Sequence, residues 1–71
     1  MTMTSKELIR LLKRNGWYKV KQEGSHLRLR KNGFNDIIIP VHNKDLAKGL
    51  LIKILKQAQI DKYILNSSYY I

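Results

Sequence analysis

One histidine in this sequence begins a short alternating segment with the residue types needed for acid–base chemistry on RNA. His26 is followed at two-residue intervals by Arg28 and Arg30, and leucines occupy the positions between them. Alternate side chains of an extended strand point to one face, so the imidazole and both guanidinium groups are expected to share a surface. A histidine, whose pKa is ordinarily about 6.5, can accept the proton of an RNA 2′-hydroxyl, which then attacks the adjacent phosphorus. The arginines could bind the phosphodiester and stabilise the developing charge.

The same residues also have an ordinary structural interpretation. A single histidine at the start of a strand is usually a polar surface residue, and arginines on a strand usually form a solvated face. His42 could be a second proton-transfer group, but we favour a hydrogen bond that holds its loop, because the sequence fixes no distance between the two rings. Trp17 and Tyr18 could stack on RNA bases, although Trp17, directly after a helix-ending glycine, is expected in the core.

Other catalytic arrangements have little support in the sequence. It contains no phosphate-binding loop, no paired-carboxylate motif and no pattern that indicates a Ser-His-Asp set. Two histidines, five scattered acidic residues and no cysteine make a poor set of metal ligands. We therefore expect neither a metal nor another cofactor.

The chain carries a large positive charge for its length. Its 71 residues include 14 Lys and Arg against 5 Asp and Glu, for a net charge of +9. Nucleic acid is the leading partner, because neutralising phosphates releases counterions; an acidic protein is the alternative. No run approaches the roughly 18 apolar residues needed to span a membrane, and no signal-peptide pattern is present. A cytoplasmic protein without a membrane partner is the resulting expectation.

Two helices flank the alternating part of the chain. Thr4 and Glu7 fit a capping box, and an Asn-Gly pair supplies a left-handed end, so the first helix is expected over residues 5–14. The second is expected from residue 46 or 47 to 58, with apolar residues at helical spacing on one side and lysines on the other. A short helix could follow at residues 61–65.

Three strands are expected between the helices, over residues 17–23, 26–31 and 34–39. Gly24-Ser25 separates the first two, and Asn32-Gly33 is a strong signal for a tight hairpin turn between the second and third. The first strand alternates apolar and basic residues, which predicts a half-buried strand. The order helix, three strands, helix predicts one α+β domain over residues 1–71, with a three-stranded antiparallel sheet that carries both helices on one face. This is the arrangement of the double-stranded RNA-binding domain.

Four segments together resemble a known family. "TSKELIRLLKRNGW", "EGSHLRLR", "IIIPVHNKDLAKG" and "ILKQAQI" are similar to the HicA toxins of bacterial toxin–antitoxin pairs, and the resemblance covers roughly residues 4–60. Its most specific parts are the Gly-Ser-His triplet and the Pro-x-His that closes the third strand. The resemblance implies a small metal-independent mRNA interferase with a double-stranded-RNA-binding-like fold and a role in the stress response.

The resemblance also assigns roles to residues and implies a partner. The histidine of the Gly-Ser-His motif is catalytic in that family, which implies that His26 is the catalytic residue and that Gly24 and Ser25 form the motif's turn. A HicB antitoxin would cover the active face in a heteromeric complex. Leu50 stands where many relatives have threonine, and Ile52 where they tend to be basic, which puts substrate contacts around the second helix in doubt.

The leading hypothesis is therefore a toxin endoribonuclease that cleaves mRNA with His26 as the general base and yields a 2′,3′-cyclic phosphate and a 5′-hydroxyl. The residues expected to bind RNA are Gly24, Ser25, Arg28, Arg30, Lys21 and Lys31, with His42 as a secondary candidate. One alternative is a non-catalytic RNA-binding module of the same fold. Another is an interaction protein whose basic face serves only an acidic partner.

Overall fold

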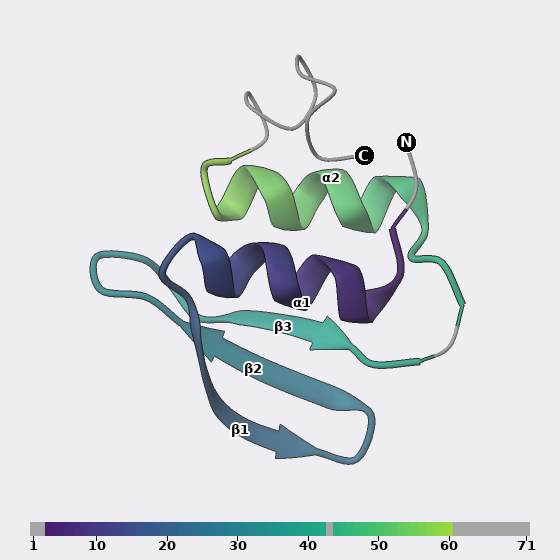
Figure 1. Ribbon diagram of the computed structural model, residues 1–71, viewed down its shortest axis with the longest axis horizontal. Helices are drawn as coiled ribbons and strands as arrows, with labels where there is room; N and C mark the ends of the chain where they lie inside the picture. Colours follow the sequence, from purple (N-terminus) through teal and green to yellow (C-terminus); the bar gives the residue numbers. More distant parts are fainter. Residues whose placement is uncertain (1–2, 43, 61–71) are drawn as a thin grey trace.

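A computed structural model describes residues 3–42 and 44–60 of the chain. The elements are α1 (Ser5–Arg14), β1 (Tyr18–Glu23), β2 (His26–Arg30), β3 (Ile37–Pro40) and α2 (Lys48–Gln57). The strands form one antiparallel sheet in the order β1-β2-β3, and both helices lie on one side of it (Figure 1). This confirms the predicted α+β, double-stranded-RNA-binding-like fold. The helix expected at residues 61–65 lies outside the described residues.

Helix α1 begins where the capping box predicts. The Thr4 hydroxyl accepts a hydrogen bond from the backbone N–H of Glu7 at 3.2 Å, and the Glu7 carboxylate accepts one from the backbone N–H of Thr4 at 2.8 Å. The two bonds satisfy backbone donors that a helix N-terminus otherwise leaves unpaired. The backbone N–H of Thr4 also lowers the pKa of Glu7, because it binds the charged form of the carboxylate.

Helix α1 ends in a Schellman motif built on Gly16. The N–H of Trp17 donates to the carbonyl of Leu12 at 3.1 Å, and the N–H of Gly16 donates to the carbonyl of Lys13 at 3.2 Å. Gly16 has φ +95°, a conformation that side chains rarely allow. The motif turns the chain so that Trp17 packs into the core, where its ring meets Phe34 edge-on at 5.4 Å between centroids. The predicted core position of Trp17 is confirmed.

Gly16→Ala should lower the free energy of unfolding by about 1–2 kcal/mol, because alanine is strained at positive φ. Its new Cβ would also lie 3.2 Å from Cε of Lys31. Gly49→Ala is a matched control, since Gly49 lies inside α2 with open space around it; that change should raise the free energy of unfolding by about 0.5–1 kcal/mol. Urea denaturation of both variants measures the two opposite effects.

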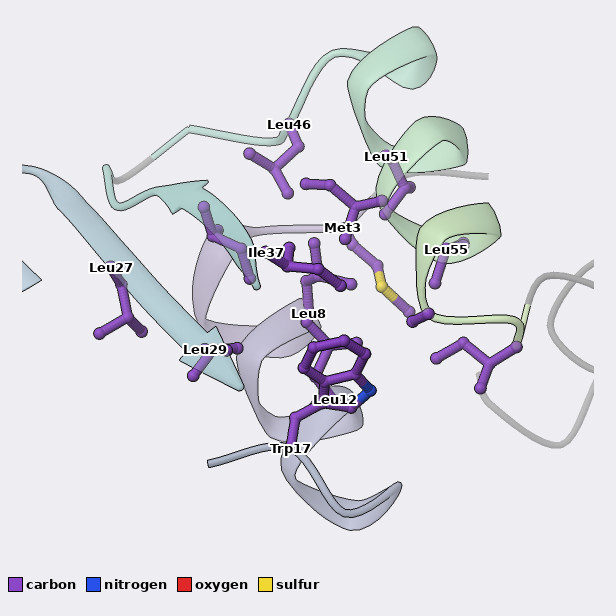
Figure 2. Packing of buried hydrophobic residues seen from close by; sticks show 14 residues of the cluster. Met3, Leu8, Leu12, Trp17, Leu27, Leu29, Ile37, Leu46, Leu51 and Leu55 are labelled. Atoms are coloured by element: carbon purple, nitrogen blue, oxygen red, sulfur yellow. The ribbon is translucent and has the colours of Figure 1, made fainter. Parts of the chain in front are cut away.

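The core lies between the helices and one face of the sheet (Figure 2). Strand β2 alternates exposed and buried residues along its whole length, which confirms its predicted period of two. The stripe expected on α2 is also buried. The largest apolar side chains that are fully buried are Leu8, Leu12, Leu29, Ile37, Ile39, Leu51, Ile54 and Leu55. In the described part of the chain, neither helix has the length and apolar character required to cross a membrane.

The connection between β2 and β3 is longer than the sequence suggested. Asn32-Gly33 does form a turn, closed by a 3.1 Å hydrogen bond from the N–H of Phe34 to the carbonyl of Lys31. The third strand, expected from Phe34, begins only at Ile37. Residues 34–36 therefore belong to the loop, and Phe34 packs against the core rather than pairing in the sheet.

The register of β3 explains this difference. A two-residue turn continued as a ladder would pair Leu29 with Asp36 and place a carboxylate on the buried face of the sheet. The observed register pairs Leu29 with Ile37 instead, and Leu27 with Ile39. Burial of the two isoleucines outweighs the turn preference, because a shift of one residue would move every side chain of the strand to the opposite face.

Strand β1 is not half-buried as predicted; all six of its residues are exposed. It lies farthest from the helices, at the bottom of the view in Figure 1, so neither of its faces is covered. A bulge also breaks its alternation, since Lys19 pairs with Leu29 and Lys21 with Arg28, which leaves Val20 as an extra residue. Tyr18 and Val20 consequently remain 50% and 39% exposed.

Candidate active site

His26 is the first residue of β2 and directly follows a two-residue hairpin turn. Gly24 has φ +56°, as the first central residue of a type II′ turn requires, and Ser25 completes the turn. The neighbours of His26 across the sheet are Glu23 on β1 and Pro40 on β3. Its side chain is exposed, so a substrate could reach the imidazole without any rearrangement of the core.

The face of the sheet that points away from the helices carries three of the cationic residues predicted for RNA, Lys21, Arg28 and Arg30. His26, Arg28 and Arg30 are all exposed while the leucines between them are buried, so the expected common face is confirmed. The register adds Lys21 beside Arg28 and Tyr18 beside Arg30 on the same face. We call this surface the outer sheet face, made of Tyr18, Lys21, Glu23, His26, Arg28, Arg30, Ile38 and Pro40.

Asp36, which the sequence reasoning missed, binds both arginines of this face. Arg30 donates from Nε to Oδ1 and from Nη2 to Oδ2 of Asp36, each at 2.9 Å, and Arg28 donates from Nη1 to Oδ2 at 3.2 Å. The Asp36 side chain is only 18% exposed. The Asn32-Gly33 motif predicts a tight two-residue turn, and the strand pairing that such a turn implies would point Asp36 toward the core. For this reason the sequence contained no indication of the contact between Asp36 and the arginines.

The arginines change the protonation of Asp36. Hydrogen bonding to Arg30 is the main cause that lowers its pKa from 3.8 to about 2, and Arg28 adds to the effect; the same contact raises the pKa of Arg30. Both directions follow from an ion pair that favours the charged forms. The arginines are therefore partly neutralised within the protein, and the positive field of the outer sheet face is weaker than the sequence implied.

Asp36→Asn should destabilise the protein near neutral pH, and the difference from wild type should narrow as the pH falls. The pKa of Asp36 is depressed by folding, so its contribution is present above about pH 4 and disappears as the pH approaches 2. Urea denaturation at several pH values measures this. Glu23→Gln is the matched control, because the exposed Glu23–Lys21 pair is separated by 3.7 Å and should contribute little. A gap between Asp36→Asn and wild type that stays constant down to pH 3 would contradict the prediction.

The two lysines proposed for RNA lie in different places. Lys21 is exposed and is the cross-strand neighbour of Arg28. Lys31 follows the other end of β2, five residues from His26 or about 16 Å along an extended chain. Its ammonium lies 5.0 Å from the centroid of the Phe34 ring, where it makes a cation–π contact. The structure brings Lys21 close to the centre of the outer sheet face, whereas Lys31 lies on the other side of the sheet, against Phe34 and Gly16.

A buried serine holds the loop that carries His42 beside the Gly24-Ser25 turn. Ser5 is 1% exposed; its hydroxyl donates to the carbonyl of Pro40 at 2.6 Å and accepts from the backbone N–H of His42 at 3.4 Å. The N–H of Val41 donates to the carbonyl of Ser25 at 2.6 Å. These bonds fix the main chain at Ser25, directly before His26, and at Pro40, the neighbour of His26 on β3. The His42 side chain itself is exposed.

Ser5 had a detectable signal in the sequence, although it was not singled out. It precedes Leu8 by three residues and Leu12 by seven, so it lies on the buried stripe of α1. A hydroxyl at such a position needs a hydrogen-bond partner, and the end of β3 provides one. Elsewhere in residues 3–42 and 44–60, no three His, Asp or Glu side chains come together as a set of metal ligands.

The sequence and the fold both match known toxin–antitoxin proteins. Residues 5–60 match the family of the HicA toxin of bacterial toxin–antitoxin systems. A solved structure described as a toxin–antitoxin complex from Streptococcus pneumoniae contains a chain that is 38% identical, with a TM-score of 0.72. The match covers 80% of the present chain and 97% of that chain. No curated protein matches the sequence.

Proposed function

Since the chain belongs to the HicA toxin family, we propose that it is an endoribonuclease that cleaves mRNA without a metal cofactor, with His26 as the catalytic residue. The observation that carries the proposal is the position of His26 in a Gly-Ser-His turn, exposed on the same sheet face as Arg28 and Lys21. Cleavage of RNA needs little more than a base for the 2′-hydroxyl and cations around the phosphorus, and this face offers both.

The proposed reaction begins when the imidazole of His26 takes the proton of the 2′-hydroxyl. The 2′-oxygen forms a bond to the adjacent phosphorus, and the bond from phosphorus to the 5′-oxygen breaks. The leaving oxygen takes up a proton from water or from a second group, for which His42 is the candidate. The products are a 2′,3′-cyclic phosphate and a 5′-hydroxyl. Arg28 and Lys21 would stabilise the negative charge that builds up on phosphorus.

The remaining predicted contacts extend this centre along the sheet. Gly24 and Ser25 allow the RNA backbone to approach the turn closely. Arg30, farther along β2 on the same face, is bound to Asp36, and Lys31 contacts Phe34 beside the end of α1; we expect neither to reach the phosphate at the cut site. Tyr18, which is half exposed on the same face, could stack on a base, a contact worth about 1–3 kcal/mol in single-strand binding.

A HicB-type antitoxin is the proposed protein partner, in the cytoplasm. Two observations support it: the similar solved structure is a toxin–antitoxin complex, and the net charge of +9 suits an acidic surface. An antitoxin that covers the outer sheet face would block His26 and the cations around it at the same time. Inhibition would then need no change in the conformation of the toxin.

The test is cleavage of an end-labelled RNA in EDTA, beside the same oligonucleotide with one 2′-deoxy sugar at the cut site. The purified protein should cut the RNA and leave the substituted position intact, because that sugar lacks the nucleophile. The new 3′ end should be a cyclic phosphate. Cleavage at the deoxy position would contradict the mechanism. Salt-dependent RNA binding without any cleavage would favour the non-catalytic RNA-binding module instead.

A further inference from the structure

The two arginines of the outer sheet face are held unequally by Asp36. Arg30 uses two of its nitrogens, Nε and Nη2, to bind both carboxylate oxygens at 2.9 Å. Arg28 makes a single contact, from Nη1 to Oδ2, at 3.2 Å. A guanidinium has five N–H donors, so Arg28 keeps four that Asp36 does not use. The carboxylate therefore orients the Arg28 guanidinium and leaves most of its N–H donors available for another ligand.

The two arginines also differ in their distance from His26. Arg28 is two residues along β2, or about 7 Å, and Arg30 is four residues along, or about 13 Å. Only Arg28 lies close enough to share one phosphodiester with the imidazole. Lys21 and Ile38 are the neighbours of Arg28 on the two adjacent strands, so a phosphate would approach Arg28 from above the outer sheet face.

We propose that Asp36 is a positioning residue: anchored by Arg30, it fixes the Arg28 guanidinium beside His26, where the free donors of Arg28 bind the phosphate at the cut site. Arg30 then serves to hold Asp36 and is not itself an RNA ligand. The inference rests on the proposed ribonuclease function and gives the two arginines separate roles. It also gives a function to a loop residue that the register of β3 keeps out of the sheet.

Asp36 would favour phosphate binding because it restricts the conformations of the flexible Arg28 side chain before RNA binds. An unrestrained arginine loses rotamer freedom when it binds a phosphate, and this loss weakens the contact. A bidentate ion pair on a carboxylate that is only 18% exposed limits competition from water and keeps the group in place before substrate arrives. A nearby cation held within a fraction of an ångström is what stabilisation of developing charge requires.

A competing interpretation makes the opposite prediction. If Asp36 only neutralised the arginines, it would compete with phosphate, and its removal would improve both RNA binding and cleavage. If it positions Arg28, Asp36→Asn should lower kcat by about 10- to 100-fold. Binding of RNA should then stay equal or become tighter, because the variant has one more net positive charge. Asp36→Glu retains the carboxylate and should recover part of the rate.

The assignment of the two arginines is tested by binding alone. The probe is an oligonucleotide with 2′-deoxy sugars throughout, and the readout is the slope of log affinity against log salt concentration. Arg28→Gln should reduce the slope by about one phosphate contact, whereas Arg30→Gln should leave it unchanged. Urea denaturation establishes that each variant is folded at the assay temperature.

Each result bears on a different claim. An equal loss of slope in Arg28→Gln and Arg30→Gln, or an Asp36→Asn variant that cleaves faster than wild type, would overturn the positioning role. A wild-type protein that does not cleave RNA would remove the proposed nuclease function, yet the salt slopes would still decide which arginine binds phosphate. The combination expected here is a slope change for Arg28→Gln only, together with slower cleavage by Asp36→Asn, Arg28→Gln and Arg30→Gln.

Discussion

Replacing His26 with alanine should slow RNA cleavage by about 10²- to 10⁴-fold, the range that a general base contributes. The fold should persist, because the side chain is exposed and the strand is held by its backbone and by the buried leucines beside it. Single-turnover cleavage of labelled RNA in EDTA gives the rate, and urea denaturation of the same preparation gives the stability. RNA affinity should change little, since the phosphate contacts remain.

Two further variants make the His26 result specific. His42→Ala also removes an exposed imidazole but keeps the backbone N–H that binds Ser5. A small loss of rate would exclude the His42 side chain from catalysis, and a loss as large as that of His26→Ala would make it the proton donor to the 5′-oxygen. Val20→Ala alters another exposed residue of the same hairpin and should cleave like wild type. Cleavage by His26→Ala at the wild-type rate would refute the proposed role of the imidazole.

Leu8→Ala should leave most of the protein unfolded at room temperature. Leu8 is fully buried on α1, in the centre of the core shown in Figure 2. Truncation of a buried leucine costs about 2–5 kcal/mol, while a core in a chain of this size supplies only about 3–5 kcal/mol in total. Far-ultraviolet circular dichroism and urea denaturation would reveal the loss.

Ile9→Ala provides the comparison for Leu8. Ile9 is the next residue of the same helix but is only partly buried, so the same kind of truncation should cost clearly less. A Leu8→Ala protein with the wild-type urea midpoint would show that the core is not the main source of stability. Reduced cleavage by Leu8→Ala should in turn follow the unfolded fraction, and not a change in the active site.

The sequence alone determined the features that depend on neighbouring residues. The capping box and the left-handed glycine define both ends of α1 through hydrogen bonds between residues three to five positions apart. The alternation from His26 to Arg30 defines which side chains of β2 share the outer sheet face. Element order, and with it the α+β fold, follows from the same short-range patterns. The assignment of catalysis to His26 came from the family resemblance and stays a prediction.

The tertiary structure decided which distant residues meet. Burial of Ile37 and Ile39 set the register of β3 against the local turn signal, and this register brought Asp36 to the arginines. Ser5 met the end of β3 because α1 packs beside that strand. The helices leave β1 uncovered, which no alternation of its residues could reveal. Such contacts join parts of the chain as far apart as Met3 and Leu46, and they depend on how the helices and strands pack together rather than on any local pattern.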